Sequence, residues 1–292
     1  MAKAIVGVIG GSGVYDLPGL SDLREEQVST PWGDPSDALR FGRVGDTEAV
    51  FLARHGRGHR FSPSTINYRA NIDALKRAGV TDIIALSACG SFRRELYPGM
   101  FVMIDQFEDR TYLRQSTFFG AGCVAHVSMA HPIAPLLRAR LVAAAKAEDI
   151  ACRDGGTYVC IEGPQFSSLA ESLGFQARGA DVIGMTGATE AKLAREAEIS
   201  YATVAMVTDY DCWHEEHGAV DVASVLKVVA ANADRAGALV ARALRDFPAE
   251  HETCPVGSDR SLDFALATHA SRRDPELVKK LDAVAGRVLG PA

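Results

Sequence analysis

The chain alternates between short apolar runs of strand length and longer segments with helical periodicity, and this alternation constrains its fold more than any other feature. Apolar residues in the longer segments recur every three or four positions, as on one face of a helix. The predicted strands cover 4–9, 49–53, 82–86, 101–104, 158–161 and 201–207, and the predicted helices cover 67–77, 133–147, 167–176 and 189–197. Such an alternation is typical of an α/β fold, in which ligands gather at the carboxyl ends of the strands.

The longest helix is expected after Asp221, a suitable N-cap, and before Pro248, which cannot continue a helix. We expect its apolar residues to face the core; these are Val225, Leu226, Val229, Leu239, Val240 and Ala243. After this helix the sequence turns polar, and a second short helix is predicted over 274–289. We therefore divide the chain into a main domain, 1–247, and a C-terminal tail, 248–292, which is expected to pack on that domain or on a neighbouring subunit.

Composition excludes several classes of protein. The formal net charge of −6 gives no electrostatic reason to bind nucleic acid or an anionic membrane. No apolar run reaches the ~18 residues that a membrane span needs, and the N-terminus enters a strand-like run without a cleavable signal. The cysteines are scattered, with no C-x-x-C pair, as is typical of reduced thiols. We expect a cytoplasmic protein. Because the chain as a whole is acidic, an anion could bind only at a local cluster of positively charged residues.

A glycine-rich loop, 10–13, follows the first predicted strand. Glycines let backbone N–H groups approach an anion, and the hydroxyl of Ser12 adds a donor. The loop lacks the third glycine of the dinucleotide fingerprint, where Asp16 stands, and the lysine of a P-loop. Val14 also replaces the last glycine of a nucleophile elbow. An ordinary tight turn explains such a loop equally well.

A dense cluster of cations and glycines, 53–60, ends the second predicted strand of this otherwise acidic chain. Arg54 offers a fixed fork of donors that matches an oxyanion, and His55 can donate a further bond or take a proton from a monoanion. A solvated basic loop is the main alternative. A metal site at His55 and His59 is disfavoured, because the neighbouring arginines repel a cation.

Three further groups of residues are candidates for ligand binding, and the first two of them follow predicted strands. Ser87 and Ala88 open a loop of small residues that could hold an anion or a sugar. Phe166 lies between a strand and a helix, where an aromatic ring can stack on a flat base, although core packing is the commoner fate of a phenylalanine. Met185 and Thr186 place a flexible apolar side chain beside a hydroxyl, which suits a sugar face or simple core filling.

Asp209 and Asp211 follow the fully apolar strand 201–207 and are the sharpest feature of the sequence. Side chains two apart in an extended segment point the same way, so both carboxylates are expected to face one ligand edge. Burial raises the pKa of an aspartate, and a neighbouring carboxylate raises one of the two further. One protonated Asp then donates to a ring nitrogen, while the ionised one accepts from an amine. The His-Glu-Glu-His run at 214–217 is more typical of a solvated turn than of a metal site.

Together and in this order, these segments resemble the methylthioadenosine phosphorylase branch of the trimeric purine nucleoside phosphorylases. The resemblance runs from about residue 5 to residue 244. It rests on short runs at 9–13, 30–31, 35–37, 52–56, 67–71, 88–91, 162–168 and 208–213. Each run is weak evidence, but the set in register is specific. The resemblance implies a single-domain nucleoside phosphorylase-like fold, with a mixed central β-sheet that forms a distorted barrel surrounded by helices.

The resemblance also implies a role for each matching residue. Phosphate would be held by Ser12, Arg54, His55, Ser87, Ala88 and Thr186; the nucleoside would be bound by Phe166, Met185, Val222, Val225 and His126; and Asp209 and Asp211 would read N7 and the 6-amino group of the purine. His126 would come from a neighbouring subunit of a homotrimer, with a hexamer also open. Phosphate would be a co-substrate, with no metal or organic cofactor, and Asp209 would protonate N7 as adenine leaves.

Three positions depart from the family pattern: Gly184 replaces a common Asn, and Gln165 and Leu169 replace common basic residues. The implied reaction is phosphorolysis of 5′-methylthioadenosine to adenine and 5-methylthioribose 1-phosphate, in purine and methionine salvage. Another 5′-substituted or 5′-deoxyadenosine, or a 6-oxopurine nucleoside such as methylthioinosine, remains an alternative substrate. The Arg54-His55 pair disfavours a hydrolytic nucleosidase, and a non-catalytic nucleoside-binding protein is the rival from outside the enzymes.

Overall fold

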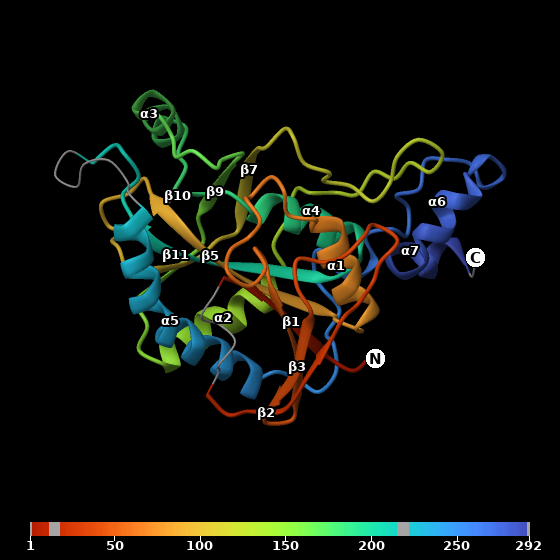
Figure 1. Cartoon of the computed structure of the whole chain (residues 1–292), viewed down its shortest axis with the longest axis horizontal. Coiled ribbons are helices and arrows are strands. Elements are labelled where there is room, and N and C mark those ends of the chain that lie inside the picture. Colours follow the sequence, from red (N-terminus) through yellow and green to blue (C-terminus); the bar gives the residue numbers. More distant parts are fainter. Residues whose placement is uncertain (1, 12–17, 215–221, 291–292) are drawn as a thin grey trace.

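A mixed α/β fold is built around one 11-stranded sheet in the computed structural model, which describes residues 2–11, 18–214 and 222–290 (Figure 1). The main path of the sheet has the order β2-β3-β4-β1-β5-β10-β9-β7, while β11 pairs with β5 and β6, and β6 pairs with β8. The strands are β1 (Ile5–Gly10), β2 (Leu20–Glu26), β3 (Leu39–Val44), β4 (Thr47–Ala53), β5 (Asp82–Ser91), β6 (Phe101–Met103), β7 (Gln106–Arg110), β8 (Cys152–Asp154), β9 (Thr157–Ile161), β10 (Val182–Gly184) and β11 (Ser200–Asp209).

Strand β5 organises the sheet because it pairs along both edges. Its first half runs parallel to β1, its last two residues run antiparallel to β10, and β11 runs parallel to it on the other side. β5 and β11 are buried nearly throughout, which suits their continuous apolar sequences. Because β4, β1, β5 and β11 are mutually parallel, their carboxyl ends meet at one edge of the sheet.

Helices cover both faces of the central strands. In Figure 1, α2 (Pro135–Ala147) and α5 (Val222–Arg245) lie together on one side of β11, whereas α4 (Gly187–Glu196) and α1 (Tyr68–Arg77) lie on the other. α3 (Leu169–Ala177) stands apart, and Ser168 caps it through reciprocal bonds with Glu171. The helices therefore leave the carboxyl edge of the sheet to loops and to the start of α5.

The predicted α/β fold with a mixed sheet and surrounding helices is confirmed, but the sheet is open and branched, so the expected barrel does not close. Every predicted strand is present with shifted ends. The prediction missed β2, β3, β7, β8 and β10. Strand β2 is almost entirely exposed and charged, and β8 and β10 have three residues each, so none of these three carries the long apolar signal that marks a strand.

Helix α5 differs from its prediction in its first half. Leu239, Val240 and Ala243 are buried in the core as expected. Val225 and Val229 are only partly buried, and Leu226 is exposed; all three line a cavity instead. The apolar periodicity of a helix predicts which of its faces is apolar, but not whether that face packs on the core or lines a cavity. In α5 the second half packs on the core and the first half lines the cavity. The expected N-cap, Asp221, lies outside the described residues.

The C-terminal tail packs on the rest of the chain. The helix predicted over 274–289 is divided at Leu281 into α6 (Pro275–Lys280) and α7 (Asp282–Leu289), and α7 packs on α1. Leu281 and Val284 are buried in the main core. The division of the chain at 247/248 stays a prediction. Among the described residues, no helix is long and apolar enough to cross a membrane.

Candidate active site

A cavity of about 360 Å³ opens at the carboxyl edge of the sheet. The predicted site residues that line it come from six different segments of the chain; they are Arg54, His55, Ser87, Ala88, Phe166, Met185, Thr186, Asp209, Asp211, Val222 and Val225. The fold therefore brings these residues into one site, as expected for the carboxyl ends of neighbouring parallel strands. Ser12 lies outside the described residues.

The segment at 87–91 is strand rather than the predicted loop. β5 continues to Ser91 because its end finds a new partner in β10 after β1 has ended. Ser87 and Ala88 consequently sit on a paired strand, where their positions are fixed by the ladder. Arg54 directly follows β4, and Thr186 links β10 to α4. We call Arg54, His55, Ser87 and Thr186 the polar wall of the cavity.

Arg54 is held by a buried carboxylate that the sequence did not reveal. Its Nε and Nη2 donate to Glu190 of α4 at 2.5 and 3.0 Å, and its Nη1 donates to the Leu86 carbonyl at 2.7 Å. Burial opposes the charge, but the paired Glu190 overrides it and raises the pKa of Arg54 above its usual range. Three of the five guanidinium N–H groups are thus used by the described residues, and the other two are available to a ligand.

His55 is neutral at physiological pH. Its Nδ1 lies 2.9 Å from the Phe61 carbonyl, so Nδ1 carries the proton and donates, and Nε2 is left as an acceptor. Burial, together with the nearby charge of Arg54, lowers the pKa of His55 to about 4. The ring of His59, which also lines the cavity, stacks on His55 with centroids 4.1 Å apart. A neutral Nε2 can accept the proton of a hydrogen phosphate.

Helix α4 points its N-terminus at the cavity. Thr186 is the N-cap, yet its side chain makes no capping bond, so the hydroxyl does not compete for the helix N–H groups. The first N–H groups of a helix and its dipole favour an anion at this position. The polar wall therefore combines a guanidinium, an imidazole, hydroxyls and a helix N-terminus, all of which are groups able to bind an oxyanion.

Asp209 and Asp211 converge on the cavity by a different geometry from the one predicted. The register of β11 against β5 shifts between Val207 and Asp209, and Asp211 adopts a left-handed conformation with φ +51°. A bulge followed by a left-handed turn, rather than an extended segment, thus aims both carboxylates at the cavity. Asp209 accepts bonds from the Thr208 hydroxyl at 2.7 Å and from the Asp211 backbone N–H at 2.8 Å.

Asp211 is the more buried member of the pair, with 5% of its surface exposed. Burial, and in smaller part the charge of Asp209, raises the pKa of the Asp211 carboxyl. The Asp211 carboxyl therefore keeps a proton to a higher pH than an exposed aspartate does. The effect of burial and of a neighbouring carboxylate that the sequence predicted for one member of the pair is thus present at Asp211.

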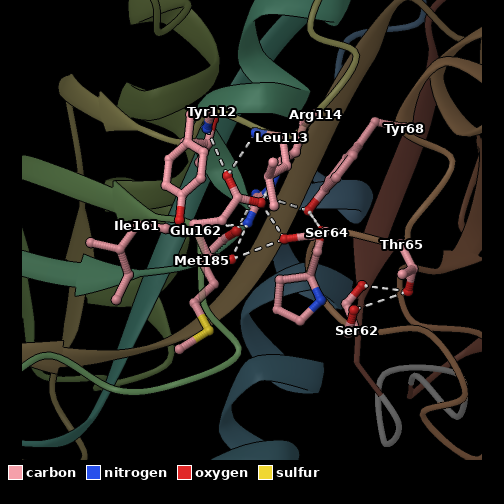
Figure 2. A network of polar contacts seen from close by, with 12 residues as sticks. Ser62, Ser64, Thr65, Tyr68, Tyr112, Leu113, Arg114, Ile161, Glu162 and Met185 are labelled. Carbon is pink, nitrogen blue, oxygen red and sulfur yellow. Dashed lines mark hydrogen bonds and ion pairs between the residues drawn. The ribbon is translucent and has the colours of Figure 1, made fainter.

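A buried cluster around Glu162 fixes the loops at the cavity's edge (Figure 2). The Glu162 carboxylate accepts from the backbone N–H groups of Tyr112 and Leu113 at 2.7 and 3.2 Å, from the Ser64 hydroxyl, and from Arg114 Nε at 3.1 Å. Burial opposes its charge, but these donors override burial and lower the pKa of Glu162. Glu162 thus joins its own segment to Ser64 and to residues 112–114, three stretches that are far apart in sequence.

Arg114 completes this cluster from inside the protein. Besides Glu162, its guanidinium donates to the Tyr68 hydroxyl and to the carbonyls of Ile161 and Met185. Its side chain is 1% exposed and directs these bonds inward rather than to the cavity. In Figure 2 the side chain of Met185 extends away from this cluster. Arg114 thus holds the backbone of Met185 and leaves its thioether free to contact a ligand.

Another part of the cavity lining is apolar and largely exposed. Phe166, Val222 and Leu226 line the cavity with 44%, 61% and 59% of their surfaces exposed, and Val225 lies beside them. We call these four residues the apolar wall. Because so much of this surface is in contact with solvent, a ligand's apolar group would gain free energy by covering it.

His126 does not line this cavity. It lies on the loop between β7 and α2, where its backbone N–H donates to the Ala265 carbonyl of the C-terminal tail at 2.9 Å. Its predicted place in the site of a neighbouring subunit remains a prediction. Within the described ranges, no three His, Cys, Asp or Glu side chains are grouped so as to hold a metal ion.

Known proteins that resemble this chain in sequence belong to one family. A profile of the phosphorylase superfamily matches residues 5–245. The S-methyl-5′-thioadenosine phosphorylases of Bradyrhizobium diazoefficiens and Rhodospirillum rubrum are 65% and 55% identical to the chain, each over 99% of its length and over 99% and 98% of their own.

Solved structures agree with these relatives. A methylthioadenosine phosphorylase from an antarctic soil metagenomic library superposes with a TM-score of 0.91 at 44% identity, covering 97% of this chain and 99% of its own. A mutant adenosine/methylthioadenosine phosphorylase from Schistosoma mansoni, in complex with methylthioadenosine, superposes with a TM-score of 0.82 at 38% identity, covering 93% and 99%. The chain therefore belongs to the phosphorylase superfamily.

Proposed function

We propose that this chain uses inorganic phosphate to cleave 5′-methylthioadenosine into adenine and 5-methylthioribose 1-phosphate. One observation carries the proposal: an oxyanion site, a pair of carboxylates and an apolar wall line the same cavity. These three features match the phosphate, the purine and the 5′-methylthio group. The names of the relatives and the methylthioadenosine-bound neighbour support the same substrate.

The polar wall binds and aims the nucleophile. The two free N–H groups of Arg54, the hydroxyls of Ser87 and Thr186, and the N-terminus of α4 hold the phosphate oxygens, and His55 Nε2 accepts its proton. Fixing phosphate close to the anomeric carbon converts a bimolecular encounter into a positioned one. Glu190 keeps Arg54 in place without taking up all of its donors.

The carboxylate pair assists the departure of adenine. Adenine is a poor leaving group as an anion, so a proton given to N7 from Asp209 eases departure while the ribose becomes oxocarbenium-like. Asp211 lies beside it and receives the 6-amino group. In its ionised form Asp211 attracts an amino group but repels the carbonyl oxygen of a 6-oxopurine, so this form of the site favours adenine over hypoxanthine.

Phe166 and Met185 position the rest of the nucleoside. The ring of Phe166 lies against the base, and the thioether of Met185 lies against the ribose. Val222 and Val225 surround the 5′-substituent, and this apolar wall binds a methylthio group more favourably than a hydroxyl. No metal or organic cofactor takes part in this scheme.

The test is the release of adenine from a panel of 5′-substituted adenosines, each with its inosine counterpart, with and without phosphate. We expect release only with phosphate, fastest with the 5′-methylthio compound and far slower with the inosines. Release in water alone would indicate a hydrolase. Equal rates for inosines and adenosines would contradict the roles given to Asp209 and Asp211.

The proposal includes a cytoplasmic homotrimer in which His126 reaches the cavity of a neighbouring copy. Light scattering on a size-exclusion column checks the mass in solution. His126→Ala should raise the KM for 5′-methylthioadenosine while the KM for phosphate stays unchanged. A monomer with full activity would overturn this part of the proposal and leave the reaction itself intact.

A further inference from the structure

The hydroxyl of Tyr158 lies behind the polar wall and contacts one of its members. Tyr158 is on β9, fully buried, and its Oη is 3.1 Å from Oγ of Ser87. It does not line the cavity, so it cannot touch a ligand bound there. Neither residue type nor spacing in the sequence marks Tyr158 as part of a site.

The direction of this hydrogen bond follows from the surroundings of Tyr158. A buried tyrosine hydroxyl needs an acceptor, and in the described part of the chain Ser87 Oγ is the only hydrogen-bond partner of Oη. Burial raises the pKa of Tyr158 well above its usual range, so the hydroxyl keeps its proton. Tyr158 is therefore the donor and Ser87 the acceptor.

This direction leaves the proton of Ser87 free for another acceptor. Within the protein that acceptor is the Ala88 carbonyl at 3.3 Å, longer than the 2.5–3.0 Å usual between oxygen atoms. A phosphate oxygen in the cavity offers a shorter, charge-assisted bond. A serine that already accepts a hydrogen bond is also a stronger donor, because neighbouring hydrogen bonds polarise one another.

Glycine at 184 makes room for this arrangement. A Cβ on Gly184 would overlap Tyr158 Oη and stand 2.5 Å from Cζ, so the phenol occupies the volume that a side chain would need. On its other side the ring packs against Phe107, edge to face, with centroids 5.3 Å apart. The departure of Gly184 from the family's common Asn is thus linked to the tyrosine on the adjacent strand.

We propose that Tyr158 is a positioning residue for the phosphate co-substrate, donating to Ser87 so that the serine hydroxyl points at a phosphate oxygen. The inference rests on the proposed phosphorolysis and adds to it a residue that does not touch phosphate. It predicts a selective effect, since among the described residues the hydrogen bond of the Tyr158 hydroxyl goes to Ser87, a residue of the polar wall, and not to a residue placed against the nucleoside.

The experiment measures Tyr158→Phe, Ser87→Ala and the double variant, with the KM of both substrates and with calorimetric binding of inorganic phosphate to the free enzyme. Removing one neutral hydrogen bond should raise the KM and Kd for phosphate about threefold to tenfold. The KM for 5′-methylthioadenosine should change by less than about twofold. In the Ser87→Ala background, Tyr158→Phe should have no further effect.

Tyr97→Phe, at a half-exposed tyrosine outside the cavity, is the matched control and should leave phosphate binding unchanged. The inference is overturned if Tyr158→Phe leaves phosphate binding at the wild-type value. It is equally overturned if the KM of both substrates rises together, or if the effect persists at full size without Ser87. If the wild type releases no adenine with phosphate, the proposed function fails, whereas the calorimetric comparison still decides the role of Tyr158.

Discussion

The two walls of the cavity differ in how much the rest of the chain buries and holds their side chains. In the polar wall, Arg54 is 3% exposed and bonded to a fully buried Glu190, and Ser87 is paired with a buried tyrosine. In the apolar wall, Val222 and Leu226 are more than half exposed. The polar wall is therefore held in place by the protein itself, without a ligand. The apolar wall exposes surface that a ligand or a neighbouring subunit can bury.

The difference has a physical reason. Polar groups that stabilise a charged reactant act best when other protein groups already orient them, since nothing then has to rearrange during the reaction. Apolar groups need no orientation, and their contribution comes from the area that a ligand or a neighbouring subunit buries. Substitutions in the polar wall should therefore affect folding and catalysis, whereas substitutions in the apolar wall should affect affinity alone.

Glu190→Gln should have the largest effect. It leaves the buried guanidinium of Arg54 without its counter-charge, and breaking a buried pair in this way costs about 3–5 kcal/mol of the free energy of unfolding. Denaturant unfolding measures this loss, and phosphate affinity should fall with it. A loss below about 1 kcal/mol would show that the polar wall is not held by this pair.

Glu196→Gln is the matched control, on the same helix and also buried. Burial raises the pKa of Glu196 to about 7, so folding takes up a proton between the unfolded pKa near 4.5 and that value. The stabilising contribution of the protonated form is present below pH 4.5 and lost as the pH rises through 7. At pH 8 the free energy of unfolding of the variant should be at least that of the wild type. The variant should be least stable relative to the wild type at low pH, where the wild-type Glu196 is protonated.

Glu162→Gln should have the next largest effect. An amide has one acceptor oxygen in place of two, so if it still accepts from the Tyr112 and Leu113 N–H groups, its NH2 faces Ser64 and the Arg114 guanidinium. A lost charge-assisted bond of this kind costs about 1.5–3 kcal/mol. Because Arg114 holds Met185 through this cluster, kcat should fall as well. Glu26→Gln, at an exposed glutamate of β2, is the control and should change stability by less than about 0.5 kcal/mol.

Val222→Ser tests the apolar wall. The side chain is already exposed, so the free energy of unfolding should change by less than about 0.5 kcal/mol. The KM for 5′-methylthioadenosine should rise about fivefold to tenfold, since one apolar contact in a pocket is worth about 1–3 kcal/mol. Leu23→Ser, on β2, serves as a control for exposed apolar residues. If Val222→Ser lowered the free energy of unfolding by more than it weakened the binding of 5′-methylthioadenosine, the proposed difference between the two walls would be wrong.

His251→Asn should have the smallest effect and none on activity. His251 Nδ1 lies 2.8 Å from Asp82 at the start of β5, and this bond raises the pKa of His251. Its stabilisation is present below the unfolded pKa near 6.5 and is lost as the pH rises through the folded value. Thermal unfolding at pH 6 and 9 should show a difference of at most about 1 kcal/mol that disappears at the higher pH.

Local patterns were enough to predict much of this protein. The buried runs that became β1, β5 and β11, and the helices between them, follow from apolar periodicity. Arg54 and Asp209 were predictable because each lies at the carboxyl end of a strand. Strand β2 was missed because an exposed, charged edge strand carries no such periodicity.

The sequence by itself determined the class of fold and the residues that end each central strand, because both depend on neighbours within a few positions. Only the tertiary structure decided which partners hold those residues. Glu190 lies 136 positions from Arg54, and Tyr158 lies 71 positions from Ser87. Buried polar groups must find a partner wherever the chain brings one, so these pairings are set by how β4, β5, β9 and α4 pack and leave no signal in the local sequence.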